Sequence, residues 1–191
     1  MLGVLAAFIN STGRRSKLPV LGSVKPFTLT NQLGEVTTLQ NLKGKVWVAD
    51  IIFVVCLGPC PKMTEEMSKL QTAFDAKEPV RFVTLTTFPE HDTPEVLKTY
   101  SEKFSADPAR WYFLTGSKQE LLANLAIKSL MLSTVEKEKV LQQSENDRFI
   151  HTTKFVLVDK TGKIRGYYDS LEPPFQETIR ADIKSLLAER P

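Results

Sequence analysis

The sequence has very few of the side chains that form disulfides or bind transition metals. Its 191 residues include two cysteines and two histidines. One pair of cysteines excludes a disulfide-rich scaffold, but it is compatible with a catalytic or metal-binding pair. Cys56 and Cys60 lie in one short segment with three residues between them. This segment is therefore the first candidate for a functional site.

The chain also lacks a strongly charged or repetitive region. It has 25 Lys and Arg against 22 Asp and Glu, a formal net charge of +3, and the two signs are mixed along the chain. This pattern indicates an ordinary solvated surface, and we expect no nucleic-acid partner. The sequence shows no internal repeat or low-complexity tract, and its length suits one domain with a full core.

The N-terminus carries an apolar run, residues 1–9, that is shorter than the roughly 20 residues of a transmembrane helix. The basic residues Arg14, Arg15 and Lys17 follow this run, whereas in a signal peptide they precede it. We interpret residues 1–25 as a tether that carries the end of a removed or truncated membrane anchor. A start codon placed late and an ordinary terminus are the alternatives. Residues 26–191 are the predicted domain.

The hydrophobic pattern predicts strands that alternate with helices. Short strands at 27–30 and 36–39, joined by a turn, predict a hairpin, and residues 46–55 predict a strand buried on both faces. A helix follows, with Cys60 as its N-cap and Pro61 at its first position. The further predicted elements are a strand at 80–86, a helix from 94 to about 104, a short strand at 111–115, a helix from 118 to about 127, strands at 154–159 and 164–169, and a helix at 176–188. This order predicts an α/β fold, a thioredoxin-like α/β/α sandwich with an added N-terminal β-hairpin.

The position of the cysteine pair suits two kinds of chemistry. A strand that runs into a helix at Cys56 and Cys60 places both sulfurs near the positive end of the helix dipole, which we expect to lower their pKa. A thiolate is both a nucleophile and a ligand for soft metals, so the pair can cycle between dithiol and disulfide or bind a metal. Redox thioredoxins have two residues between their cysteines. The three residues here let the sulfurs spread around a metal and still permit a disulfide.

Three segments of the chain follow one another in the order in which a known family has them. The first is Cys56–Pro61, a Cys-x-x-x-Cys-Pro motif behind an apolar strand, with Met63 and Thr64 after it. The second, residues 82–95, is similar to that family's Asp-Pro-x-x-Asp-Thr-Pro segment, and the third, residues 151–168, to its histidine strand and hairpin. Over roughly residues 20–188 the chain resembles the Sco/SenC family of copper-binding assembly proteins.

The resemblance implies that the chain handles copper. Cys56 and Cys60 would be the sulfur ligands and His151 the nitrogen ligand, an arrangement in which two thiolates suit Cu(I) and the added imidazole accommodates Cu(II). The implied partner is the copper-site subunit of cytochrome c oxidase, to which the protein would deliver copper or whose thiols it would reduce. Other copper chaperones are further expected partners. The implied location is the periplasm or the outer face of the inner membrane, or the mitochondrial intermembrane space, with an N-terminal membrane anchor.

Two other interpretations of the cysteine pair place the chain among enzymes. A thiol–disulfide oxidoreductase would use the pair on cysteines of a partner protein without a required metal. Redox thioredoxins usually carry a cis-proline just before the strand that begins at Lys154, whereas this chain has His151-Thr152-Thr153, which favours a metal. A peroxiredoxin is disfavoured because Ala49 and Phe53 occupy its proline and threonine positions. We therefore expect a metallochaperone, with oxidoreductase activity as the alternative.

The chain departs from the family pattern beside the second segment and within the cysteine motif. Phe88 stands where the family commonly has Asp before Pro89, so any role of that carboxylate in metal loading is lost or moved. Leu57 follows Cys56 where Pro is more usual, and Gly58 adds flexibility to the loop.

Three other potential metal ligands have a simpler interpretation. His91, the second histidine, lies in a polar segment and is expected to be solvated. Met63 and Met67 recur at helical spacing with Leu70, which predicts core positions rather than ligands.

Overall fold

A computed structural model describes residues 18–132, 134–138, 140 and 149–189. The predicted anchor end at residues 1–9 lies outside the described residues. Within the described part, the helices are all too short or too polar to span a bilayer.

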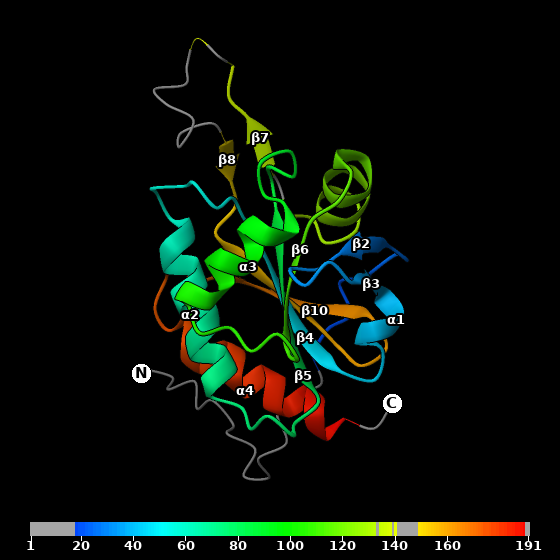
Figure 1. Cartoon of the computed structure of the whole chain (residues 1–191). Helices are drawn as coiled ribbons and strands as arrows, with labels where there is room; N and C mark the ends of the chain where they lie inside the picture. The colour runs from blue at the N-terminus through cyan, green and yellow to red at the C-terminus, as the bar shows by residue number, and fades with distance from the viewer. Residues whose placement is uncertain (1–17, 133, 139, 141–148, 190–191) are drawn as a thin grey trace, which may run out of the picture.

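A six-stranded mixed sheet forms the centre of the domain (Figure 1). Its order is β1-β10-β9-β4-β5-β6. The bounds of these strands are β1 Gly22–Ser23, β4 Val46–Ile52, β5 Val80–Thr86, β6 Trp111–Leu114, β9 Lys154–Val158 and β10 Lys163–Asp169. Strands β4, β5 and β6 are parallel, whereas β9 runs antiparallel to β4 and β10 antiparallel to β9. The two central strands are buried on both faces because helices or further layers cover each side of the sheet.

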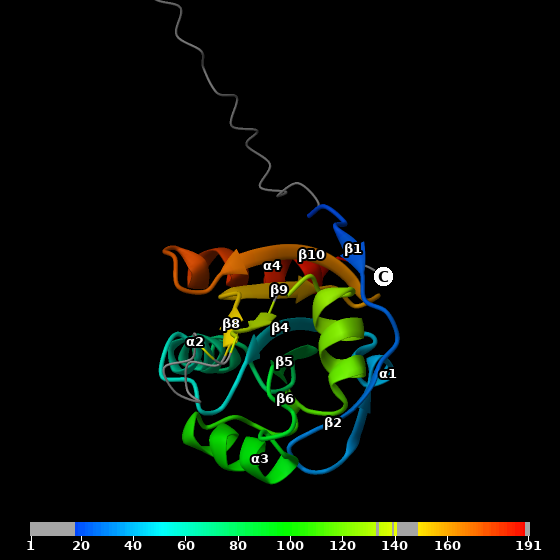
Figure 2. The ribbon, with the colours of Figure 1, turned by 90° about the horizontal axis from the view of Figure 1, so that it is seen from above.

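Two hydrophobic cores lie on the two faces of the sheet. Helices α2 (Cys60–Thr72), α3 (Pro94–Lys103) and α4 (Phe175–Ala188) supply residues to one core. The short helix α1 (Leu39–Leu42) and the π-helix η1 (Gln119–Ile127) supply residues to the other. Figures 1 and 2 show these two groups on opposite sides of the sheet. The predicted thioredoxin-like α/β sandwich is confirmed.

The predicted N-terminal hairpin is present as β2 (Thr28–Thr30) and β3 (Val36–Thr38), which pair antiparallel. The structure differs from the predicted elements in several places, and strand β1 and helix α1 were not predicted. The buried strand predicted for 46–55 ends at Ile52, and helix α2 has Pro59 rather than Cys60 as its N-cap. A second small hairpin, β7 (Thr134–Glu136) with β8 (Phe149–His151), was not predicted.

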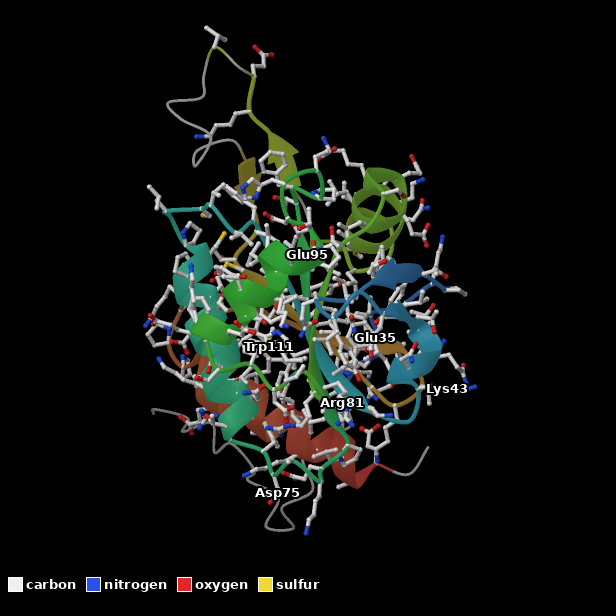
Figure 3. All side chains as sticks on the ribbon, viewed as in Figure 1. Glu35, Lys43, Asp75, Arg81, Glu95 and Trp111 are labelled. Atoms are coloured by element: carbon white, nitrogen blue, oxygen red, sulfur yellow. The ribbon has the colours of Figure 1, made fainter. Side chains whose placement is uncertain are left out.

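The direction of the central strands decides which loops meet. Ile52 at the end of β4 lies opposite Thr86 at the end of β5, because the two strands are parallel and in register. Strand β9 runs antiparallel to β4, so its first residue, Lys154, comes to the same edge. We call this the cysteine edge, because the loop that follows β4 carries both cysteines. Asp75, labelled in Figure 3, lies beyond the far end of α2, away from this edge.

The opposite edge of the sheet is held by a buried arginine. Arg165 is 3% exposed, and its Nη1 donates to Asp159 Oδ2 at 2.8 Å and to Glu189 Oε2 at 2.9 Å. Its Nη2 donates to the carbonyl oxygen of Leu18 at 2.6 Å, and its Nε to that of Pro19 at 3.0 Å. One side chain therefore ties the first described residues and the end of α4 to the β9–β10 hairpin.

Replacing Arg165 with Leu is expected to lower the free energy of unfolding by about 3 kcal/mol, because it leaves two carboxylates without their buried partner. Urea denaturation followed by circular dichroism measures this change. Lys62→Ala is the control, because the Lys62 side chain is exposed in its ion pairs with Glu65 and Glu66, and we expect a much smaller change there. Equal stabilities of Arg165→Leu and wild type would show that the arginine network contributes nothing.

Candidate metal centre

The loop after β4 turns sharply and carries the first cysteine into the domain. The backbone N–H of Cys56 donates to the carbonyl oxygen of Phe53 at 3.2 Å, which closes a turn. Cys56 is 5% exposed and Cys60 is 0% exposed, whereas Leu57 between them is 80% exposed. Both cysteines are free thiols. The loop therefore presents an apolar side chain to solvent while it holds both sulfurs inside.

Helix α2 begins at Cys60, and hydrogen bonds in its first turn hold this residue in place. The N–H of Met63 donates to the carbonyl oxygen of Pro59 at 2.9 Å, which starts the helix. Thr64 Oγ1 donates to the carbonyl oxygen of Cys60 at 2.9 Å and lies 2.9 Å from the hydroxyl of Tyr100 on α3. Met63 and Met67 are fully buried in the core beneath the loop, so their predicted core positions are confirmed.

The predicted lowering of the pKa at the helix start is wrong for Cys60. Burial is the largest cause that raises the pKa of this thiol far above its ordinary value. A hydrogen bond with Cys56 and the charges of Cys56 and Asp50 raise it further, and only a backbone hydrogen bond at Phe53 lowers it. Desolvation of the sulfur therefore outweighs the helix dipole, and Cys60 stays protonated at neutral pH in the metal-free protein.

Asp50 is a charged neighbour of the thiols that the sequence interpretation missed. It is fully buried on β4 and shares a strand face with Val48 and Ile52, which belong to the same core as both cysteines. Its charge contributes to the raised pKa of Cys60 and, after burial, to that of Tyr100. A single acid inside an otherwise apolar ten-residue run was the signal in the sequence that could have identified it.

The loop between β5 and α3 lies next to the cysteine loop at the same edge. The prediction that His91 is simply solvated is wrong. Its Nδ1 lies 2.7 Å from Asp92 Oδ1, and its ring stacks on Phe88 with centroids 5.3 Å apart. Phe88 itself is buried in the core that contains both cysteines. A buried aromatic ring therefore occupies the position at which the family commonly has a carboxylate.

His151 is placed by its backbone only. It is the last residue of β8, opposite Thr134 of β7, and two residues separate it from the start of β9 at the cysteine edge. Figure 1 shows β7 and β8 at the end of the molecule where the loop enters α2. Its side chain lies outside the described part of the structure, so its role as a ligand stays a prediction.

The segment that joins β8 to β9 is firmly attached to the domain. Thr153 Oγ1 donates to both oxygens of Asp169 at 2.9 and 3.0 Å, and Ser170 Oγ donates to the carbonyl oxygen of Thr153 at 2.7 Å. These bonds link the start of β9 to the end of β10. His151, two residues before Thr153, is therefore attached to a firmly held segment of the backbone.

The two free thiols fit a soft metal, because thiolate sulfur is the preferred ligand of Cu(I). They do not complete a site alone. In the described ranges, no group of three or more His, Cys, Asp and Glu side chains is arranged to hold a metal ion.

In the reduced, metal-free protein, iodoacetamide at neutral pH is expected to modify Cys56 before Cys60, because the second thiol is fully buried and protonated. Mass spectrometry of Cys60→Ser and Cys56→Ser measures the two rates separately. The same reaction in urea is the control, where both rates should become similar. Equal rates in the folded protein would contradict the burial of Cys60.

Known proteins with a similar sequence and fold share this arrangement of elements. The SCO1/SenC family model matches residues 19–188. The SCO1 protein homolog of Bacillus subtilis is 36% identical over 174 residues, 91% of this chain and 87% of the relative. A putative copper-binding protein of Stutzerimonas stutzeri is 28% identical over 153 residues, 78% of this chain and 71% of the relative.

Solved structures agree with these sequence matches. A SCO1/SenC family lipoprotein from Bacillus anthracis is 36% identical with a TM-score of 0.76, over 87% of this chain and 96% of the other. BsSco, a member of the Sco family of cytochrome c oxidase assembly proteins, is 34% identical with a TM-score of 0.76, over 92% and 100% of the two chains. Bradyrhizobium japonicum ScoI, solved with copper bound, is 25% identical with a TM-score of 0.72, over 86% and 99%. The chain described here belongs to the SCO1/SenC family.

Proposed function

We propose that this protein is a copper chaperone that binds copper through Cys56, Cys60 and His151. It would deliver the metal to the dinuclear copper site of cytochrome c oxidase, or reduce the thiols of that site. The observation that carries the proposal is the pair of buried, mutually hydrogen-bonded thiols at the start of α2, which are not joined in a disulfide. These thiols lie in a chain of the SCO1/SenC family.

The chemistry of the pair supports copper as the cargo. Two thiolates satisfy Cu(I), and the imidazole of His151 would extend the donor set for Cu(II). The apolar surroundings, with Phe88 in the same core, disfavour a free thiolate and favour a neutral thiol or a metal-bound sulfur. The low exposure of both cysteines would also limit the access of bulk water to a metal bound there.

Relatives support the metal, the pathway and the location. The relative from Bradyrhizobium japonicum has been solved with copper bound, and BsSco belongs to a group of cytochrome c oxidase assembly proteins. The relatives include a lipoprotein of Bacillus anthracis and mitochondrial SCO2 of Saccharomyces cerevisiae. We infer a membrane-attached protein of the periplasm or outer face of the inner membrane, or of the intermembrane space in a eukaryote.

A thiol–disulfide oxidoreductase is the second candidate function. The hydrogen bond between the two thiols favours it, because sulfurs this close can form a disulfide. BsSco, moreover, has an identified disulfide switch. The two functions are compatible, because a target's cysteines must be reduced before they accept copper. A disulfide-reduction activity that does not depend on His151 would distinguish pure thiol chemistry from metal transfer.

Anaerobic titration of the reduced protein is expected to show one copper bound per chain. Cys56→Ser and Cys60→Ser should each abolish tight Cu(I) binding. His151→Ala should weaken Cu(II) binding by about a hundredfold or more, because removal of only a hydrogen-bond partner of a metal ligand already costs up to about a hundredfold. His91→Ala is the control for the other histidine and should weaken Cu(II) binding far less than His151→Ala, because its ring is held by Asp92 and Phe88. Electron paramagnetic resonance and visible spectra report the Cu(II) site. Unchanged binding in His151→Ala would remove that residue from the site.

Copper affinity is expected to rise with pH, because copper displaces thiol protons. The raised pKa of Cys60 keeps its proton on throughout the neutral range, so the apparent Cu(I) association constant should increase about tenfold per pH unit for each proton released. Competition with a Cu(I) chelator between about pH 6 and about pH 8 measures the slope. A slope of zero in wild type would show that the thiols are already ionised.

A further inference from the structure

We propose that Asp92 is a positioning residue for the thiol pair, which it holds through the backbone of the cysteine loop. Asp92 is 0% exposed, and a buried carboxylate needs hydrogen-bond donors to offset its lost hydration. One of its donors is the N–H of Val54, which bonds to Asp92 Oδ2 at 3.2 Å. Val54 stands two residues before Cys56, inside the turn that closes on the carbonyl oxygen of Phe53. The carboxylate therefore reaches the turn that carries the first sulfur.

The carboxylate is itself held from two other sides. Thr86 Oγ1 donates to Asp92 Oδ2 and accepts from the N–H of Phe88 at 2.9 Å. His91 Nδ1 lies 2.7 Å from Asp92 Oδ1. The N–H groups of His91 and Asp92 both donate to the carbonyl oxygen of Phe88, at 3.1 and 2.8 Å. Because these contacts fix the carboxylate on its own loop, it can act as a rigid support for the neighbouring one.

The two loops are joined at a second point. The N–H of Thr87 donates to the carbonyl oxygen of Ile52, the last residue of β4, at 2.7 Å, which extends the pairing of β4 and β5 one residue past the end of β5. The bond at Val54 lies further along the cysteine loop. Only five residues, 55–59, separate Val54 from the start of α2 at Cys60, and Cys56 is one of them. The Asp92 bond therefore limits how far Cys56 can move relative to Cys60.

This role concerns the geometry of the thiols and does not require that they bind copper. A pair held in place forms its disulfide with less loss of conformational freedom, so its effective concentration is higher. Loosening the loop should therefore make the disulfide less stable relative to the dithiol. The same loosening should expose Cys56 and speed its modification.

The test is the equilibrium of the reduced, metal-free protein with oxidised glutathione. In that reaction Cys56 and Cys60 lose two protons and two electrons as their sulfur–sulfur bond forms, and one oxidised glutathione becomes two reduced molecules. Asp92→Ala should lower the equilibrium constant about tenfold, the equivalent of one lost charge-assisted hydrogen bond. Asp92→Asn keeps an oxygen that can accept from Val54 and should fall between Asp92→Ala and wild type. Iodoacetamide labelling of Cys56 should become faster in the same order.

Asp159→Ala is the matched control. Asp159 is also a mostly buried carboxylate that holds a turn, since its Oδ1 accepts from the N–H groups of Thr161 and Lys163 at 2.8 and 3.0 Å. It lies at the opposite edge of the sheet, so its loss should reduce stability and leave the thiol equilibrium unchanged. A purely structural effect of Asp92 would make the two variants behave alike.

Wild-type values of the equilibrium constant and of the labelling rate in folded Asp92→Ala would overturn the proposal. If Asp92→Ala does not fold, wild-type values in Asp92→Asn overturn it instead. Absence of copper binding by the wild-type protein would end the proposed chaperone function and leave this test intact, because neither measurement uses copper.

Discussion

The parallel pairing of β4 with β5 is the constraint on which the site depends. Because the two strands run together in register from Val46 and Val80, they also end together at Ile52 and Thr86. The loops that follow must then meet at one edge. One loop carries the cysteines, and the other carries Phe88, His91 and Asp92. The antiparallel β9 brings the start of its own strand, and the segment after His151, to the same edge.

Burial of the sulfurs then determines their chemistry. A thiol at a helix start is activated when solvent can reach it, but here both sulfurs lie in an apolar core with Phe88 and Tyr100. Desolvation and the nearby charges of Cys56 and Asp50 keep the proton on Cys60. Cys60 is therefore a poor nucleophile in the reduced, metal-free protein.

The departure at position 88 has a structural consequence. Where the family commonly has a carboxylate, the chain has a ring that lies in the core and stacks on His91. Two buried acids remain at this edge of the sheet. Asp50 lies on β4, and Asp92, the second aspartate of the family's segment, accepts a hydrogen bond from the backbone of the cysteine loop.

Much of the fold followed from local patterns in the sequence. The alternation of strands and helices, the N-terminal hairpin, the cysteine loop ahead of a helix and the core positions of Met63 and Met67 are set by residues close together in the chain. Those residues determine local conformation and the inner face of each element, so a sequence pattern is sufficient to predict them. The resemblance to the SCO1/SenC family was visible for the same reason, since its motifs are short and contiguous.

Only the tertiary structure decided the environment of the thiols. The pKa of Cys60 depends on burial and on charges from β4, and the contacts of His91 depend on a carboxylate and a ring that the loop folds around it. The bond from Asp92 to Val54 joins residues that are 38 positions apart, a distance over which sequence periodicity carries no information. The sequence by itself determined which two sulfurs are available. The packing of three separate segments at one edge decided how strongly those sulfurs hold their protons and how firmly they are held in place.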